Sequence, residues 1–355
     1  MMRVKIEDVC MKGSSNLKQS DVVGKNGIYP VYGAAGYLGS IDSFKQSKPY
    51  VAVVKDGAGI GRAMLLPSNS SIIGTMQYLL PKDNILPEYL YYLIKAKHLE
   101  KYYSGATIPH IYFKDYKNEE FDLFSFEIQY QIINKLKIIE KIIEKQKKEM
   151  DLLDELVKAR FVELFGNIFD NKNCFPIVKI EDVCSLIKDG THQTPKYVEK
   201  HEGGFKFLSS KDVMSQKIDW SNIKYIPIEL HEKLYSALKP QKNDILMSKN
   251  GVNYGVAAIN DTNEVFDIYV SLALLRPKDI INSIYFRCAI NSYETKRQFD
   301  SSIKGIGVPN LHLGEIKKTK ILLPPIELQN QFADFIKEVD KSRFIIKSMI
   351  KEGPL

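Results

Sequence analysis

The sequence predicts a mixed α+β protein in which two globular domains are joined by a long antiparallel two-helix coiled coil. Three observations lead to this prediction: one central segment patterned as a continuous helix, a second amphipathic helix near residue 340, and motifs that occur twice in the same order. The predicted divisions are a first domain over 1–124, a helix over 125–165, a second domain over 166–324 and a shorter helix over 325–355.

The central helix is predicted by the absence of helix-breaking residues and by the spacing of its apolar residues. Neither glycine nor proline occurs between Pro109 and Gly166, and apolar residues recur three and four positions apart, as in a coiled-coil seam. Ser125 is a candidate N-cap and Gly166 a candidate stop. At 1.5 Å per residue such a helix is roughly 60 Å long, so we expect it to separate two domains. The predicted seam residues are Ile132, Leu136, Ile139, Ile143, Met150, Leu153 and Val157.

The second helix, over 325–350, has apolar residues in the same register but is shorter. Two long amphipathic helices most simply pack on each other, and the alternative is that each lies along its own domain or a separate subunit. Two polar residues, Gln146 and Arg160, interrupt the seam of the first helix, and we expect Arg160 to face a domain or a partner. The seam residues of the second helix are Phe332, Ile336, Val339 and Ile346.

The motif repeat indicates an internal duplication. The seven residues from Val4 to Cys10 return unchanged from Val178 to Cys184, which chance does not explain in one chain. Other pairs keep the same order while their offset grows, so the second copy should contain insertions. These pairs are 54–57 with 248–251, 80–83 with 276–279, 108–111 with 308–311, and 127–131 with 327–331.

Each copy is predicted to be a globular α/β or α+β domain followed by its helix. Short β-rich runs broken by glycine and proline predict strands, and longer periodic runs predict helices. In the first copy the expected strands are 49–54 and 72–80 and the expected helix is 88–103. In the second copy the expected strands are 205–208, 244–248 and 269–275 and the expected helix is 282–300.

Composition limits the possible functions. The chain has 355 residues, of which 44% are hydrophobic and 26% charged, and a formal net charge of +7 permits nucleic-acid binding without proving it. No apolar run is long enough to span a membrane, and the first 12 residues lack the apolar core of a signal peptide. We expect neither a disulfide framework nor a metal site, because the 4 cysteines and 6 histidines show no ligand spacing.

No motif predicts catalysis. The glycines at 57, 59 and 61 suggest a nucleotide-binding loop, but Arg62 occupies the position of the required third glycine and 63–67 reads as a strand. We therefore expect a tight hairpin there, and another at Asn250-Gly251. The chain lacks a Walker lysine motif and a nucleophile elbow, and Pro324-Pro325 does not match the catalytic motif of amino methyltransferases.

What remains are polar loops that combine lysines, amides, hydroxyls and an aromatic ring. Such residues contact phosphates and base edges in DNA, although each loop taken alone is also typical of an ordinary turn. These loops are 189–197, 208–212 and 249–255.

With these residues in view, the sequence resembles the specificity subunit of type I restriction–modification enzymes over essentially its whole length. The resemblance rests on several short motifs that occur together. They are Asp189-Gly190-Thr191-His192-x-Thr194-Pro195, the runs 207–213 and 272–277, Asp244-Ile245-Leu246-x-Ser248-Lys249-x-Gly251, Pro324-Pro325-x-Glu327-x-Gln329-x-Gln331, and the runs 29–36 and 158–166. The first copy lacks the Asp-Gly-Thr-His motif.

The resemblance implies a prokaryotic cytoplasmic protein that is not itself an enzyme. Each of two target recognition domains would read one half of a bipartite double-stranded DNA target. The helices would form an antiparallel coiled coil that docks two methyltransferase (modification) subunits, and ATP-dependent restriction (helicase-nuclease) subunits would join them. S-adenosylmethionine, ATP and Mg would bind to those partners, with no cofactor or metal on this chain. The length of this coiled coil would then set the distance between the two half-sites.

Two rival interpretations stay open: a stand-alone tandem-repeat DNA-binding regulator or adaptor, and a nucleotide-dependent catalyst that uses Gly57 to Gly61. On the leading interpretation, the candidate DNA-binding residues are polar or aromatic side chains on the loops of both copies. They are Tyr32, Lys55, Arg62, His110, Thr191, His192, Gln193, Lys196, Ser209, Ser210, Lys211, Lys249, Asn250, Asn253, Tyr254, Asn310 and His312.

Overall fold

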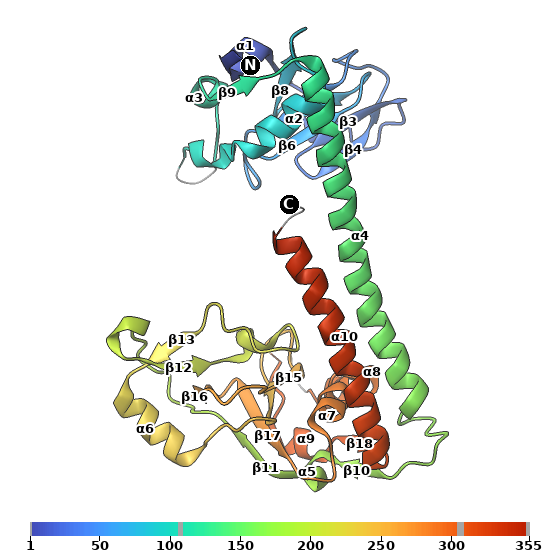
Figure 1. Ribbon diagram of the computed structural model, residues 1–355, viewed down its shortest axis with the longest axis vertical. Coiled ribbons are helices and arrows are strands. Elements are labelled where there is room, and N and C mark those ends of the chain that lie inside the picture. The colour runs from blue at the N-terminus through green and yellow to red at the C-terminus, as the bar shows by residue number, and fades with distance from the viewer. Residues whose placement is uncertain (1, 106–108, 304–308, 353–355) are drawn as a thin grey trace. The chain divides into compact units, whose positions relative to one another are not determined.

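The computed structural model describes residues 2–105, 109–303 and 309–352, and the chain forms two compact units. Unit 1 is Met1–Lys145 and unit 2 is Gln146–Leu355. One uninterrupted helix, α4 (Phe126–Phe165), contributes to both units (Figure 1). The predicted helix over 125–165 is therefore present, while the predicted four-part division into domains stays a prediction.

Unit 1 contains three small sheets and a few helices. The sheets have the strand orders β1-β9, β2-β8-β5-β6 and β4-β3-β7. The strands are β1 (Met2–Lys5), β2 (Cys10–Ser14), β3 (Tyr29–Gly33), β4 (Gly36–Ile41), β5 (Tyr50–Val54), β6 (Ala63–Leu66), β7 (Ser71–Ile72), β8 (Met76–Pro81) and β9 (Glu120–Leu123). The helices that precede α4 are α1 (Ile6–Val9), η1 (Gln19–Asp21), α2 (Pro87–Ala96), η2 (Leu99–Tyr102) and α3 (Phe113–Tyr116).

Unit 2 repeats this plan with additional helices. Its sheets have the orders β10-β18, β11-β17-β14-β15 and β13-β12-β16. The strands are β10 (Ile177–Lys179), β11 (Cys184–Asp189), β12 (Phe205–Leu208), β13 (Lys224–Ile226), β14 (Ile245–Ser248), β15 (Ala257–Ile259), β16 (Phe266–Ile268), β17 (Leu272–Pro277) and β18 (Lys320–Leu322). The helices are α5 (Ile180–Val183), η3 (Lys200–Glu202), η4 (Ser210–Val213), α6 (Ile228–Ala237), α7 (Ser283–Ile290), α8 (Tyr293–Ser302), α9 (Leu313–Lys318) and α10 (Ile326–Glu352).

The predicted duplication is confirmed strand by strand. In both units the four-stranded sheet is antiparallel throughout, and the three-stranded sheet combines one antiparallel pair with one parallel pair. The repeated seven-residue motif forms a strand followed by a one-turn helix in each copy, α1 and α5. Helix α6 and the 3-10 helices η3 and η4 account for part of the greater length of unit 2.

A central strand in each four-stranded sheet explains why its sequence is apolar throughout. All five residues of β5 are buried, because Val51 and Val53 face a core beneath α2 while Ala52 and Val54 face a second cluster on the other side. Successive side chains of a strand point to opposite faces, so burial on both faces removes the usual alternation of apolar and polar residues. Strand β14 is placed in the same way in unit 2.

Each of the two helices predicted within the globular parts is divided into two helices in the structure. Residues 88–103 form α2 and η2, interrupted at His98, whose φ is +49°. Residues 282–300 form α7 and α8, and the Ser292 hydroxyl caps the second helix by accepting a bond from the amide of Thr295. The predicted strand over 269–275 begins only at Leu272.

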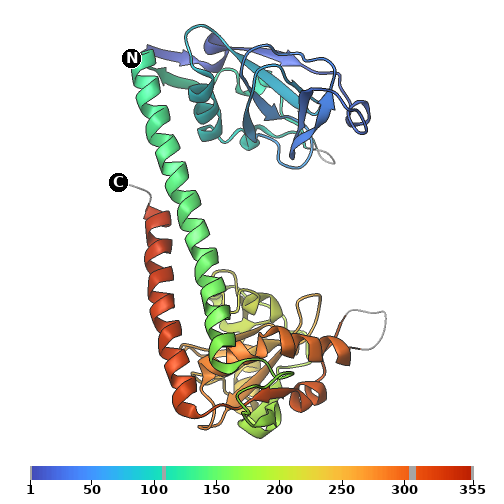
Figure 2. The same cartoon turned by 90° about the vertical axis from the view of Figure 1, so that its right-hand side faces the viewer.

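Within unit 2, α10 runs antiparallel beside the C-terminal half of α4 (Figures 1 and 2). An aromatic cluster joins them: the rings of Phe161 and Phe165 lie 5.6 and 5.4 Å from the ring of Phe332, and both contact Tyr285 of α7. Gly166 ends α4 with φ +67°, the left-handed conformation expected of a stop residue. The predicted packing of the two helices on each other is thereby confirmed for this region.

The predicted seam needs two corrections. Ile132 packs into the core of unit 1, together with the buried Ile133, so this part of α4 binds its own domain. On α10 the seam includes a charged residue, Arg343, between Val339 and Ile346. The remaining seam positions of both helices are half-buried or buried, and Arg160 forms an ion pair with Glu163 of α4 itself.

Two further observations concern the cysteines and the question of a membrane-spanning helix. Burial raises the pKa of both the Cys10 and Cys184 thiols to about 12, so these thiols are protonated at neutral pH. Cys288 is half-buried and Cys174 is exposed. In the described part of the chain, no helix is both long and apolar enough to cross a membrane.

Candidate nucleic-acid interface

Each unit presents a glycine-containing hairpin loop at one end of its four-stranded sheet. We call residues 55–62 and 249–256 the hairpin loops. Both close with the same bonds: the amide of Gly61 donates to the carbonyl of Val54 at 2.9 Å, and the amide of Gly255 donates to that of Ser248 at 2.8 Å. Both loops need left-handed glycines, since φ is +81° at Gly61 and +87° at Gly255. The loops are thus hairpins, as predicted, and each joins two antiparallel strands.

A second segment lies against each hairpin loop. We call residues 109–111 and 309–311 the clamp segments. In unit 1 the amide of Gly57 donates to Pro109 at 3.0 Å and the amide of Ile111 donates to the carbonyl of Lys55 at 2.9 Å. In unit 2 the matching bonds join Gly251 to Pro309 at 3.1 Å and Leu311 to Lys249 at 2.8 Å. The repeated pairs 108–111 and 308–311 therefore mark a shared contact, although residues 108 and 308 themselves lie outside the described residues.

The hairpin loop and clamp segment of unit 1 meet through a charged pair. Nδ1 of His110 lies 2.7 Å from Oδ1 of Asp56, and the ammonium of Lys55 lies 3.4 Å from the other carboxylate oxygen. The His110 ring stacks on that of Tyr112, with ring centres 6.4 Å apart. The side chains of His110 and Lys55 are 36% and 30% exposed, so water or a ligand can reach both.

The same position in unit 2 carries amides. Asn250 pairs through its backbone with Asn310, as Asp56 does with His110. The Oδ1 atom of Asn250 is buried and has no hydrogen-bond partner among the described residues, whereas Asn310 is exposed. An amide presents both a donor and an acceptor, which is the chemistry that reads adenine edges in DNA.

The structure corrects the role predicted for Lys249. Its side chain is only 7% exposed, and its ammonium donates to the carboxylate of Asp189 at 2.7 Å. Burial would raise the pKa of Asp189, but the hydrogen bond and charge of Lys249 outweigh it and hold that pKa below its usual range. A buried, paired ammonium is not placed to meet a DNA phosphate. Lys249 instead fixes the hairpin loop to the end of β11.

The segment 189–197 continues from that ion pair to the surface. Backbone bonds hold Thr191, whose amide donates to Ile268 and whose carbonyl accepts from Val270, both at 3.0 Å. The side chains of His192, Gln193 and Lys196 are exposed. Thr191 therefore positions the segment, and the three residues after it stay candidates for direct contact.

A third segment of unit 2 meets the same place. The amide of Ser210 donates to the hydroxyl of Ser271 at 3.0 Å, while the carbonyl of Ser271 accepts from the amide of Lys249 at 2.8 Å. The Ser209 hydroxyl donates to Asp212 within its own turn, and the exposed Lys211 side chain donates to the carbonyl of Asn222 at 3.1 Å. Ser271 thus connects two of the predicted loops.

The other candidates differ in exposure. Asn253 and His312 are exposed, but Tyr254 is 9% exposed and donates its hydroxyl to Asp300 of α8 at 2.5 Å. The ammonium of Lys296 lies 3.4 Å from the centre of the Tyr254 ring, which closes it off further. The predicted DNA contact of Tyr254 is therefore corrected to a packing role.

In unit 1, two candidates lie beside the hairpin loop. The exposed Arg62 guanidinium donates to the carbonyl of Ala34 at 3.2 Å, which connects the hairpin loop to the turn between β3 and β4. Tyr32 packs edge-on against Tyr37 and lines a groove that also includes Met64 and Tyr91. Both residues stay candidates, Arg62 for phosphate contact and Tyr32 for apolar contact.

Sequence reasoning missed the acidic partners of this site. Asp56 and Asp189 hold His110 and Lys249, yet neither was among the predicted residues. Asp56 could have been found, because it lies next to Lys55 in a repeated motif. Ser271 carried no signal, since its role depends on strands that are distant in the sequence.

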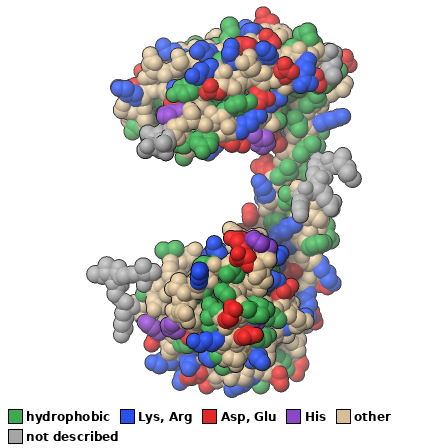
Figure 3. All heavy atoms as spheres, turned by 90° about the vertical axis from the view of Figure 1, so that its left-hand side faces the viewer, with side chains coloured by type: hydrophobic (Ala, Val, Ile, Leu, Met, Phe, Trp, Pro, Cys, Tyr) green, Lys and Arg blue, Asp and Glu red, His purple; other side chains and the backbone are tan. Residues whose placement is uncertain are grey.

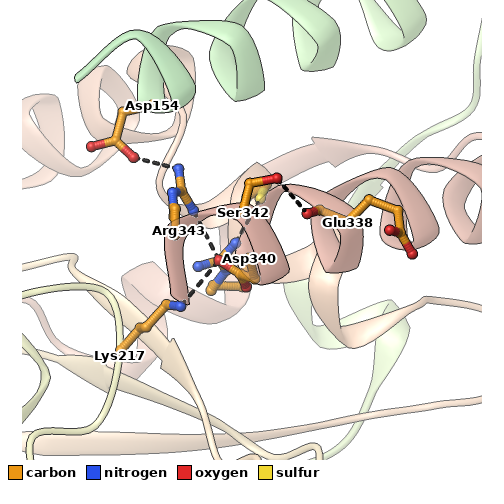
Figure 4. A network of polar contacts seen from close by, with 8 residues as sticks. Asp154, Lys217, Glu338, Asp340, Ser342 and Arg343 are labelled. Atoms are coloured by element: carbon orange, nitrogen blue, oxygen red, sulfur yellow. Dashed lines mark hydrogen bonds and ion pairs between the residues drawn. The ribbon is translucent and has the colours of Figure 1, made fainter. Parts of the chain in front are cut away.

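A polar network supports the helix pair of unit 2. Arg343 of α10 lies between Asp154 of α4 and Asp340, with the Asp340 contact at 3.0 Å, and Lys217 reaches Asp340 at 3.1 Å (Figure 4). The Arg343 side chain is only 14% exposed, so its charge is well shielded from water. The network connects α4, α10 and the loop that follows η4.

Positive and negative side chains are interspersed on the one face of each unit that Figure 3 shows. On the face drawn in Figure 3, lysine and arginine side chains alternate with acidic ones on each unit. Among the residues that the structure describes, no group of three or more histidine, cysteine, aspartate or glutamate side chains is placed to hold a metal ion.

Comparison with known proteins adds a family. Residues 1–150 and 175–352 match the family model described as the type I restriction modification DNA specificity domain. The MjaVIII type I restriction enzyme specificity subunit of Methanocaldococcus jannaschii is 25% identical over 311 residues, which is 82% of this chain and 72% of that protein. The MjaIX specificity subunit of the same organism is 22% identical over 281 residues, 73% of this chain and 63% of that protein.

Solved structures share the fold. The S subunit of a type I restriction–modification system from M. genitalium has a TM-score of 0.58 at 16% identity, covering 99% of this chain and 92% of that one. A chain from a structure on complex assembly and conformational transition of the type I system also has a TM-score of 0.58, at 14% identity, covering 99% and 94%.

Proposed function

We propose that this chain, which belongs to the family of type I restriction modification DNA specificity domains, is the subunit that reads DNA sequence for a type I restriction–modification enzyme. Unit 1 reads one half of a bipartite target and unit 2 reads the other. The observation that carries this proposal is the duplicated arrangement of hairpin loop and clamp segment, which presents His110 and Asp56 in one unit but Asn310 and Asn250 in the other.

The chemistry of the exposed side chains fits duplex DNA. Arg62 in unit 1 and Lys196 in unit 2 supply cations for phosphates, and Gln193 and Asn310 supply amides for base edges. Because the same backbone frame carries different side chains, the two half-sites should differ in sequence. Binding should weaken steeply with salt, since phosphate contacts release counterions.

The chain acts without a catalytic centre of its own, as part of a multi-subunit methyltransferase and endonuclease. Two methyltransferase subunits dock on the helices, and restriction subunits join them; S-adenosylmethionine, ATP and Mg²⁺ bind to those partners. Large apolar side chains on the helices support this docking. Phe344 and Met349 of α10 are 74% and 55% exposed, and Leu152 of α4 is 51% exposed.

The test is a methylome. The chain would be expressed together with a type I methyltransferase subunit from its source organism, and N6-methyladenine would be mapped by single-molecule sequencing with and without the chain. We expect methylation of one interrupted, bipartite motif that depends on this chain. Methylation without such a motif would contradict the proposal. Duplex binding without any methylation would favour the stand-alone regulator instead.

A further inference from the structure

Two buried glutamines, one in each unit, hold the helices α4 and α10 onto their domains. Gln129 lies in the first turn of α4 and Gln329 in the first turn of α10, and both are 0% exposed. An uncharged amide that is completely removed from water must have its donors and acceptor satisfied, or it destabilises the fold. Both side chains accept one hydrogen bond and donate two, so the acceptor and both donors of each amide are satisfied.

The bonds of Gln129 join the start of α4 to the segment that leads into α2. Its Oε1 atom accepts from the amide of Leu86 at 2.9 Å, and Leu86 is the residue that caps α2. Its Nε2 atom donates to the carbonyl of Phe124 at 2.9 Å and to that of Asn84 at 3.3 Å. One side chain therefore connects the start of α4 to residues 84–86, which lead into α2, and to Phe124, which follows β9.

Gln329 makes the same three bonds in unit 2. Its Oε1 atom accepts from the amide of Asn282, which caps α7, at 2.9 Å. Its Nε2 atom donates to the carbonyls of Pro324 at 2.8 Å and Ile280 at 3.4 Å. The second copy reproduces the first in every partner although the surrounding residues differ, which shows that the arrangement belongs to the repeated fold and not to one domain.

The bonds fix a direction and not only a position. The amide accepts from and donates to the segment that leads into α2 or α7, and it also donates to a carbonyl just before its own helix. It can keep all three bonds only when the helix leaves the domain at one angle. In unit 1 this angle is reinforced further along, where Lys95 and Tyr92 of α2 bind the carboxylate of Glu140 at 3.0 and 2.8 Å. At its other end α4 packs through Phe161 and Phe165 on Tyr285 of unit 2.

We propose that Gln129 and Gln329 are positioning residues that set the angle of each domain on its helix, and so limit the DNA spacer that the protein accepts between two half-sites. This inference rests on the proposed function of reading a bipartite target. A change of angle at the start of a helix roughly 60 Å long moves the far end by many ångströms, whereas one base pair advances DNA by only about 3.4 Å. Loosening either glutamine should therefore broaden the accepted spacer while each half-site is still read.

The chain offers matched controls two residues further on. Gln131 and Gln331 occupy equivalent positions in the two helices, but both are exposed. Gln129→Met and Gln329→Met keep the length and volume of the side chain and remove its hydrogen bonds. Gln131→Met and Gln331→Met make the same chemical change where no buried bond exists.

The experiment uses the full chain assembled with its methyltransferase subunits. Methylation would be measured on duplexes that carry the two half-sites at the native spacing and at one or two base pairs more or less. We expect wild type and both control variants to favour the native spacer by at least 100-fold. Each buried variant should lower that ratio to 10-fold or less. An unchanged ratio overturns the inference, and so does an equal loss at every spacing, because that marks only a structural role.

A second pair of variants decides the matter if the methionine variants do not assemble. In Gln129→Glu and Gln329→Glu a protonated carboxyl can still accept one bond and donate one, whereas an ionised carboxylate has no donor and would face two carbonyl groups. Their spacer preference should be stronger at pH 6 than at pH 8, and a preference independent of pH overturns the inference. Wild type that methylates no bipartite duplex would instead defeat the proposed function itself.

Discussion

In unit 1 the hairpin loop meets its clamp segment through the Asp56 carboxylate and the His110 ring, whereas unit 2 places Asn250 and Asn310 at the same two positions. The backbone bonds around them agree to within 0.1 Å, at 3.0 and 2.9 Å in unit 1 and 3.1 and 2.8 Å in unit 2. The lysine that begins each loop differs as well, since Lys55 is half-exposed and Lys249 is buried. Duplication thus preserved the frame and changed the side chains that it presents.

The largest loss of stability should come from substituting the glycines of the hairpin loops, and the loss should be greater in unit 1 than in unit 2. A Cβ atom at Gly61 would lie 2.5 Å from the backbone nitrogen of Glu100, and one at Gly255 would lie 2.8 Å from the ring of Phe299, while Gly57 and Gly251 are open. Gly61→Ala should cost about 3 kcal/mol and Gly255→Ala somewhat less, because a ring moves more easily than backbone. Gly57→Ala and Gly251→Ala should each cost about 1 kcal/mol.

Urea unfolding of the full chain, followed by circular dichroism, measures these glycine variants. Trp220, the only tryptophan, lies in unit 2 and reports on that unit by fluorescence. Equal losses at the open glycines, Gly57 and Gly251, and at the closed ones, Gly61 and Gly255, would contradict the close contacts on which this ranking rests.

The buried lysine of unit 2 should matter more for stability than its counterpart. Lys249→Met leaves Asp189 with its cation removed and should destabilise unit 2 by about 2 kcal/mol, measured by the Trp220 transition. Lys55→Met is the control and should cost less than about 0.5 kcal/mol by circular dichroism, because its pair with Asp56 is longer, at 3.4 Å, and half-exposed. If the two variants lost equal stability, Lys249 would not have the structural role assigned to it.

Low pH should affect the stability of the two units differently, because one further pair of equivalent positions carries different residues. Glu119 of unit 1 corresponds to Thr319 of unit 2, and each carbonyl accepts the amide that begins α1 or α5, from Ile6 at 3.1 Å and Ile180 at 2.9 Å. Hydrogen bonds from Lys101 and Tyr102 lower the pKa of Glu119 from 4.5 to about 2.

Because the folded pKa of Glu119 lies below its unfolded value, the stabilisation is present above pH 4.5 and is lost as the pH falls toward 2. Glu119→Gln should remove about 1 kcal/mol at pH 7, since Lys101 is half-exposed and water screens the pair. Thr319→Val should leave the acid dependence unchanged. Acid unfolding of both variants by circular dichroism tests this, and an unaltered acid dependence in Glu119→Gln would contradict it.

The smallest effect concerns the helix pair of unit 2. A double-mutant cycle on Asp154 and Arg343 should give a coupling of about 0.5 kcal/mol in urea unfolding, because Asp154 is 60% exposed. A cycle on Asp154 and Lys341 is the control, since Lys341 instead pairs with Glu338 on its own helix. A coupling no larger than the control would mean that Arg343 does not fix the register of α4 and α10.

The sequence predicted best where the signal was local. The repeated motifs, the glycine hairpins and the long helix up to Gly166 each follow from residues that are neighbours in the chain. The polar anchors could not be found in this way. Lys249 and Asp189 are 60 residues apart and Gln329 lies 47 residues from Asn282, so their bonds depend on the completed fold.

The same limit explains the errors at the site. A lysine and a tyrosine in a glycine-rich loop are typical of DNA contact, but the fold turned Lys249 and Tyr254 inward, toward Asp189 and Asp300. The seam prediction failed at Ile132 for a related reason, because a heptad pattern does not say whether a domain or a helix covers it. The candidate residues that are exposed stay predictions.

One measurement tests most directly whether each unit reads its own half-site. Methylomes would be compared for wild type, for a unit 1 variant with Asp56→Asn and His110→Asn, and for a unit 2 variant with Asn310→Ala. Each variant should change or relax one half of the bipartite motif and leave the other half and the adenine methylation in it intact. Changes in both halves from a variant in one unit would contradict the account.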